Sequence, residues 1–182
     1  MNKPKFFVGT QLMAGVFCLS AHVAFAQTAA QIEAAKDILA KVPAAELASR
    51  SAELVANAPA KERAAVASAA AQVVATMNPD LASATVAAIS LRVPIVAPAA
   101  AAAAAAKLPN AAGGIAVAAA QVPGVKVSDV RPAVIAAVPS QAGQVVAALA
   151  RANLRSSLKQ EAGTPAVVAV VPANSNKTGI FF

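Results

Sequence analysis

The chain is poor in the side chains that most enzymes use. Over 182 residues it has no Trp or Tyr, one Cys and one His. Cys18 and His22 both fall within positions 1–26, and beyond that segment only Phe181 and Phe182 are aromatic. The rest of the chain therefore lacks thiolates, imidazoles and rings on which nucleic-acid bases stack. We expect no enzymatic activity, no cofactor, no metal site and no specific nucleic-acid binding.

The N-terminal segment, 1–26, has the order of charge and hydrophobicity that directs export. Lys3 and Lys5 give a basic start, and an uncharged, mostly apolar run follows over residues 6–25. In a secretory signal the basic end stays inside while the apolar stretch enters the membrane as a helix. The segment resembles a bacterial Sec-type signal, which implies a periplasmic or extracellular protein.

The cleavage site is predicted between Ala26 and Gln27. Signal peptidases accept small side chains at the third and first positions before the cut, and Ala24 and Ala26 occupy these positions. The alternative is an uncleaved anchor, because the apolar run is about as long as the ~20 residues of a membrane span. A lipid anchor on Cys18 is not expected, since the bulky Phe17 precedes it. We expect no membrane span in the mature chain.

The composition predicts a helical protein with a thin core. Hydrophobic residues make up 58% of the chain, but most are alanine. A buried methyl group stabilises by only ~0.8 kcal/mol, although alanine is the best helix former. No disulfide supplements this burial. We therefore expect self-association, or a protein partner, through apolar helix faces.

The mature chain is mildly basic. Without Lys3 and Lys5 it has thirteen Lys and Arg against eight Asp and Glu, a net charge of +5. This charge permits weak binding to anionic surfaces but is too diffuse to require it.

Prolines divide the chain into segments with helical periodicity, so the predicted fold is all-α, with short helices joined at prolines in an irregular bundle or a helix-pair solenoid. The apolar stripe of the first segment is formed by Ile32, Ala35, Leu39 and Val42. The predicted helices cover residues 28–42, 43–57, 60–77, 79–92, 115–122, 131–138 and 141–161. Asn78 and Ser140 are predicted N-caps.

The proline spacing favours repeated helix pairs. Pro43 and Pro79 are 36 residues apart, and Pro59 and Pro94 are 35 apart. Repeats of this length are typical of helical solenoids. The bulky aromatic residues of tetratricopeptide repeats are absent, so the spacing predicts repeated pairs of helices but not membership of that family.

The predicted organisation has four parts after the signal at 1–26. They are an N-terminal helical segment at 27–92, a Pro/Ala-rich low-complexity segment at 93–114, a C-terminal helical segment at 115–163 and a disordered tail at 164–182. The second part contains eight consecutive alanines, Ala99 to Ala106, and is either a short helix or a flexible spacer.

One set of charged residues is a candidate binding site. Arg151, Arg155 and Lys159 recur every four residues and so share a face of the last helix, where they could contact the phosphates of an anionic membrane or polymer. The ordinary alternative is a solvated face near a helix C-terminus. Glu33 and Asp37 lie one turn apart and are expected to be solvent-exposed acids rather than a catalytic pair.

These observations together predict a non-enzymatic, exported, Ala-rich helical protein with a structural or scaffolding role in the cell envelope or outside the cell. The alternative is a peripheral binder of anionic membranes or polymers through the basic helix face. Ice binding is disfavoured, because Thr28, Thr76 and Thr85 do not follow an eleven-residue spacing. An unstructured cell-wall spacer is a further alternative.

The signal assignment predicts the N-terminus of the mature protein. When the full chain is produced in a bacterium, N-terminal sequencing of the exported product should begin at Gln27. Replacing Ala26 by Phe should leave the precursor uncut, because the peptidase pocket does not admit a large side chain. A product of the unaltered chain that retains Met1 would instead indicate an anchor.

Overall fold

A computed structural model of the protein describes residues 29–163, with side chains described as far as Ser156. This range is all-α, as predicted. Helical residues 29–39 form the N-terminal helix. The following α-helices are α2 (Leu47–Asn57), α3 (Arg63–Met77), α4 (Ala82–Arg92), α5 (Ala97–Lys107), α6 (Ala112–Ala120), α7 (Val127–Ala137) and α8 (Ala142–Gly163). Short 3-10 turns precede five of them: η1 (Ala44–Glu46), η2 (Pro79–Leu81), η3 (Pro94–Val96), η4 (Pro109–Ala111) and η5 (Pro139–Gln141).

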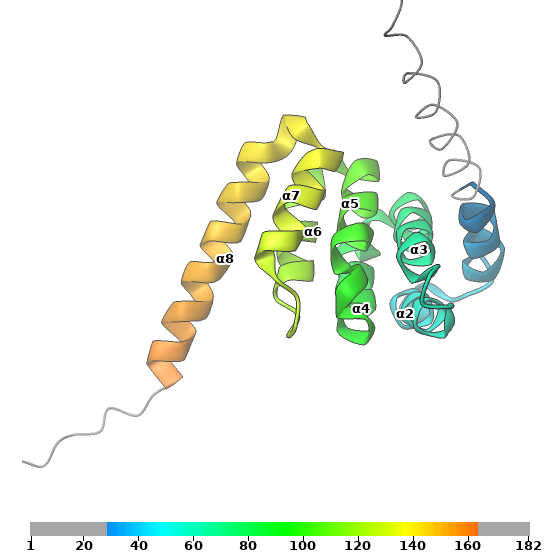
Figure 1. Ribbon diagram of the computed structural model, residues 1–182, viewed down its shortest axis with the longest axis horizontal. Helices are drawn as coiled ribbons and strands as arrows, with labels where there is room; N and C mark the ends of the chain where they lie inside the picture. The colour runs from blue at the N-terminus through cyan, green and yellow to red at the C-terminus, as the bar shows by residue number, and fades with distance from the viewer. Residues whose placement is uncertain (1–28, 164–182) are drawn as a thin grey trace, which may run out of the picture.

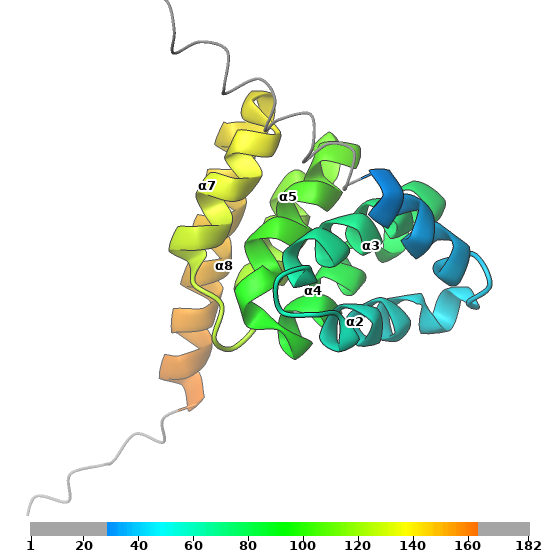
Figure 2. The same cartoon turned by 45° about the vertical axis from the view of Figure 1, so that its right-hand side comes forward.

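The helices stack in two layers, and successive helices alternate between the layers. In one layer α3 packs on α5 and α5 on α7, while in the other α2, α4, α6 and α8 follow one another. Each helix also contacts its sequence neighbour in the opposite layer. The stack advances in chain order from the N-terminal helix (blue) to α8 (orange), which lie at opposite ends (Figures 1 and 2). This arrangement is the helix-pair solenoid.

A single residue before a proline makes most of the sharp corners. Val93 donates its N–H to the Ile89 carbonyl, ending α4, and its own carbonyl accepts the N–H of Val96, opening η3. Its backbone has φ −139° and ψ 79°, outside the helical region, because the next residue is proline. The same geometry recurs at the residues before Pro79, Pro109 and Pro139.

These corners set a regular repeat, in which each helix with its corner is one unit and two units form a pair. Pro79, Pro94 and Pro109 are 15 residues apart, and Pro139 follows Pro109 at twice that spacing. The spacings of 36 and 35 noted above exceed two such intervals because both include residues of the longer connection at 58–62, which joins α2 to α3.

Alanine fills the centre of the stack. Just over half of the buried apolar residues are alanines, and α5 buries its side chains against α3, α4, α6 and α7. Ala100, Ala101, Ala104 and Ala105 are all fully buried. The segment at 93–114 therefore forms a central helix with its flanking corners, which settles the alternative between helix and spacer.

The stripe predicted for the first helix is confirmed, and some local details differ. Leu39 is fully buried, whereas Met77, the last residue of α3, is 40% exposed. Pro132, expected at a helix boundary, lies inside α7, where it is exposed and removes only one backbone hydrogen bond. Asn78 precedes η2 and Ser140 lies within η5, and neither caps a helix through its side chain. The predicted signal and tail lie outside the described residues.

Two adjacent glycines of α6 differ in their surroundings. A β-carbon added to Gly113 would lie 3.1 Å from the β-carbon of Ala148 in α8, whereas one added to Gly114 would meet nothing within 4 Å. Gly113 therefore permits the close approach of α6 and α8, and Gly114 does not contribute to it.

Alanine substitutions should separate these roles. Gly114→Ala should stabilise the protein by about 0.5–1 kcal/mol through helix propensity. Gly113→Ala should be at least ~1 kcal/mol less stable than Gly114→Ala, because it makes the same gain but presses α8 outward. Chemical unfolding followed by circular dichroism measures both, and equal stabilisation by the two changes would contradict the close packing.

Candidate interaction surfaces

An uncharged groove runs between α4 and α6 on the outside of their layer. It is shallow and open to solvent, with a volume of about 440 Å³. Its lining residues are Ser83, Ala84, Ala87, Ala88 and Leu91 from α4, and Ala118, Gln121, Val122 and Pro123 from α6 and the following turn. Leu91 is 67% exposed at the end of the groove. The groove arises because the two helices meet through side chains as small as alanine and serine.

A second hollow lies beside η3 and the turn that follows α6. Ile95, in η3, is 87% exposed, the highest exposure among the large apolar side chains described. The other residues that line this hollow are Pro94, Pro98, Gly124, Val125, Lys126 and Asp129, so it includes a basic and an acidic side chain. Gly124 has a positive φ of 85° and turns the chain toward Pro94, so that an added β-carbon would lie 3.8 Å from that ring. The hollow shares no lining residue with the groove and is more polar.

A third apolar surface lies on α8, on the side opposite its contact with α6. It is formed by Gly143, Val146, Ala147, Ala150 and Leu154, which we call the open face of α8. Val146 is 44% and Leu154 65% exposed. Because α8 forms one end of the stack (Figure 1), no described helix covers this face.

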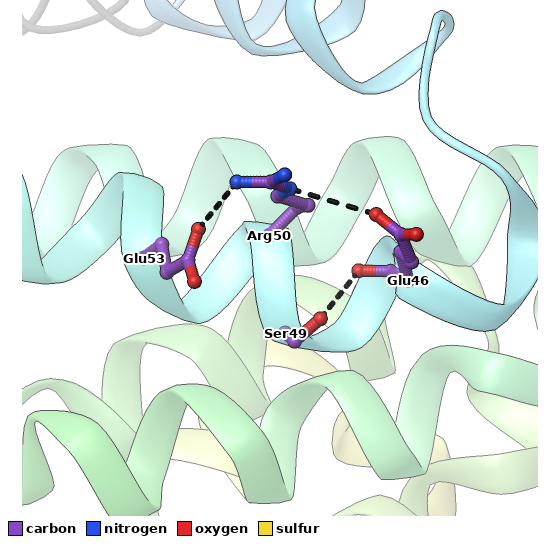
Figure 3. A network of polar contacts seen from close by, with 4 residues as sticks. All are labelled: Glu46, Ser49, Arg50 and Glu53. Atoms are coloured by element: carbon purple, nitrogen blue, oxygen red, sulfur yellow. Dashed lines mark hydrogen bonds and ion pairs between the residues drawn. The ribbon is translucent and has the colours of Figure 1, made fainter.

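The other end of the stack is charged. Arg50 of α2 lies between two carboxylates, as Figure 3 shows, with its Nη1 2.9 Å from Glu53 Oε2 and its Nε 3.7 Å from Glu46 Oε2. The Ser49 hydroxyl donates to the Glu46 carbonyl at 2.9 Å. About half of each charged side chain is exposed, so these pairs keep the end solvated and add little stability.

The predicted basic residues lie on α8. Arg151 and Arg155 are both exposed, and neither forms an ion pair with another described side chain. Arg155 also lines a hollow between α6 and α8. The side chain of Lys159 and the predicted cleavage residues Ala24, Ala26 and Gln27 lie outside the described part of the chain.

The net basic charge of the mature chain lies in residues 81–182, its last two thirds. Residues 27–80 contain five Lys and Arg against six Asp and Glu, a net charge of −1. Residues 81–182 contain eight against two, a net charge of +6. The end of the stack that carries α8 is therefore the basic end.

The acidic pair of the N-terminal helix is an ordinary surface feature. Glu33 Oε2 lies 3.7 Å from Lys36 Nζ, and Asp37 is exposed. Within residues 29–156, no three His, Cys, Asp or Glu side chains gather as they would around a metal ion. None of the described helices combines the length and hydrophobicity needed to cross a membrane.

Sequence reasoning missed the groove and the open face, since both consist of small side chains from separate segments. One signal was readable. At the position after the corner proline, Asp80, Asn110 and Ser140 are polar, whereas Ile95 is a large apolar residue.

Comparison with known proteins does not indicate a function, so the function is argued from these surfaces. No family model, curated protein or solved structure shows a significant match to this chain.

Proposed function

We propose that this chain is an exported, non-enzymatic scaffold of the cell envelope or the extracellular space, which holds an apolar segment of a protein partner in the groove between α4 and α6. The observation that carries the proposal is the uncharged, mostly apolar lining of this groove. Leu91, which lines it, is 67% exposed, the second-highest exposure among the large apolar side chains described. An exposed apolar surface of this kind is typical of an interaction site.

The chemistry of the groove indicates the kind of segment that it accepts. No charged side chain lines it, and only Ser83 and Gln121 offer polar side-chain groups. A charged peptide would lose hydration there without gaining a partner. An aliphatic segment would instead bury its side chains against alanine methyl groups and Leu91. Solenoids commonly bind extended or helical segments along such surfaces.

Peptide selection tests the groove directly. A random peptide library displayed on phage and selected on the purified protein should yield sequences with an uncharged, aliphatic centre. Leu91→Ser should weaken their binding about 10-fold or more, since loss of a large apolar contact costs ~1.5–3 kcal/mol. Fluorescence polarisation with the selected peptides measures the dissociation constants.

Matched controls are Ile38→Ser and Leu154→Ser, which remove exposed apolar side chains at the two ends of the stack. Binding that falls equally in the controls, or a selection that enriches no aliphatic sequence, would refute the groove as the site. Reproducible catalytic turnover by the purified protein would refute the non-enzymatic assignment.

A second function, peripheral binding to anionic membranes or polymers, is favoured by the two unpaired arginines of α8. They lie at the basic end of the stack, where the net positive charge of residues 81–182 adds to their local potential. Their side of α8 also adjoins the exposed Leu154, and basic residues beside apolar ones are typical of helices that lie on anionic lipid.

Vesicle binding tests this second function. Replacing Arg151, Arg155 and Lys159 by Gln should lower partitioning onto phosphatidylglycerol-containing vesicles about 100-fold at low salt, since each contact contributes ~1 kcal/mol. Replacing Arg92, Lys107 and Lys126 by Gln removes the same charge elsewhere and should have a smaller effect. Equal losses in the two triple variants, or equal binding to neutral phosphatidylcholine, would exclude a specific basic face.

A further inference from the structure

The open face of α8 corresponds to surfaces that are covered elsewhere in the same molecule. Val86 in α4, Ala116 in α6 and Val146 in α8 occupy one position of the helix-pair repeat. Val86 and Ala116 are fully buried, whereas Val146 is 44% exposed. The difference follows from position in the stack, because α4 and α6 are each followed by another helix of their layer and α8 is not.

The glycines show the same relation. Gly113 and Gly143 also occupy equivalent positions, one pair repeat apart. A β-carbon on Gly113 would nearly collide with Ala148 of the covering helix, whereas one on Gly143 would meet nothing within 4 Å. Gly143 thus has the side-chain size needed for close helix packing, but no helix is there. The open face is built like an interior contact of the solenoid.

The open face also has the spacing of a helix–helix seam. Gly143, Ala147, Ala150 and Leu154 follow one another at intervals of four, three and four residues. This spacing places apolar side chains along one line of a helix that packs against another. The covering element should therefore be a helix with small and aliphatic side chains.

We propose that the covering helix is α8 of a second copy of this chain, packed antiparallel across a two-fold axis at Ala150. In such a pair Ala150 faces Ala150 of the second copy, and Val146 faces its Leu154. Small residues at the centre let the helices approach, and the larger residues fill the space on either side. The face is thus complementary to itself, as a two-fold interface requires.

A head-to-tail arrangement does not meet the same requirements. It would place the open face against the N-terminal end, where Arg50 and its two carboxylates are exposed (Figure 3). Burying these charges against Val146 and Leu154 would remove their hydration without providing partners. The two-fold pairing instead buries Val146, Ala150 and Leu154 and leaves the charged end in water.

The basic side chains give the dimer a distinctive salt dependence. The two-fold axis places Arg151 and Arg155 of both copies on the same side of the helix pair, where they repel one another. Salt screens this repulsion. Dimerisation should therefore strengthen as salt rises, the opposite of an interface held by ion pairs.

Analytical ultracentrifugation of the purified protein across about 1 µM to 1 mM tests the proposal. We expect a reversible dimer with a dissociation constant in the micromolar range, because one helix per partner buries less than a standard interface. Raising NaCl from about 0.05 to 0.5 M should tighten it several-fold. Ala150→Glu and Leu154→Glu should each give monomers at all concentrations, while Leu91→Glu, the same kind of change in the α4–α6 groove, should leave the dimer intact.

A cysteine at the axis provides a second readout. Ala150→Cys should form a disulfide-linked dimer with oxidised glutathione, since the two β-carbons are adjacent across the axis. Ala106→Cys, exposed at the end of α5, should not. Cys18 is replaced by Ser in both variants, so that each has a single thiol.

Three outcomes would overturn the proposal. The first is a monomer at all concentrations without preferential linkage at position 150. The second is a dimer that Leu91→Glu disrupts and Ala150→Glu does not. The third is a chain that dimerises only after residues 164–182 are removed, which would assign the open face to that segment. Peptide binding in the α4–α6 groove is measured separately, so failure of the dimer is distinguishable from failure of the proposed function.

Discussion

The close approach of helices through methyl groups is the constraint on which the structure depends. Ala100 and Ala104 of α5 and Gly113 of α6 add almost no thickness between helix axes, so corners of a single residue are long enough to connect the layers. The small size of these side chains also makes each contact weak, because a methyl group buries little apolar surface. A helix therefore depends on neighbours on both sides, and stability accumulates along the stack rather than in one central core.

Much of the fold was predictable because proline and bulky aliphatic residues carry clear signals. The prolines that precede helices predicted the all-α class. The apolar stripe with Ala35 and Leu39 predicted the buried face of the first helix. The segment at 93–114 resisted prediction, since a helix made almost wholly of alanine has no apolar periodicity that distinguishes its buried side. The prediction of a helix boundary at Pro132 was wrong because the ring of Pro132 faces solvent, where the helix tolerates the loss of one hydrogen bond.

The candidate surfaces were less predictable than the fold. Arg151 and Arg155 lie on one exposed face of α8, as their spacing indicated. The α4–α6 groove joins Leu91 to Val122, which the whole of α5 separates in sequence, so it depends on a register between helices that no local pattern reveals. The open face of α8 exists because no helix among residues 29–163 covers it, and the periodicity of the sequence does not contain that information.

Because successive helices alternate between the two layers, the layer of each helix depends on whether an odd or an even number of helices precedes it. Adding or removing one helix with its corner would shift every later helix into the opposite layer and exchange its inward and outward faces. Adding or removing a whole helix pair would keep each face in its place and change only the length of the stack. Pairs are therefore the natural unit of growth for such a chain, and insertions of a single helix should be tolerated only at its ends.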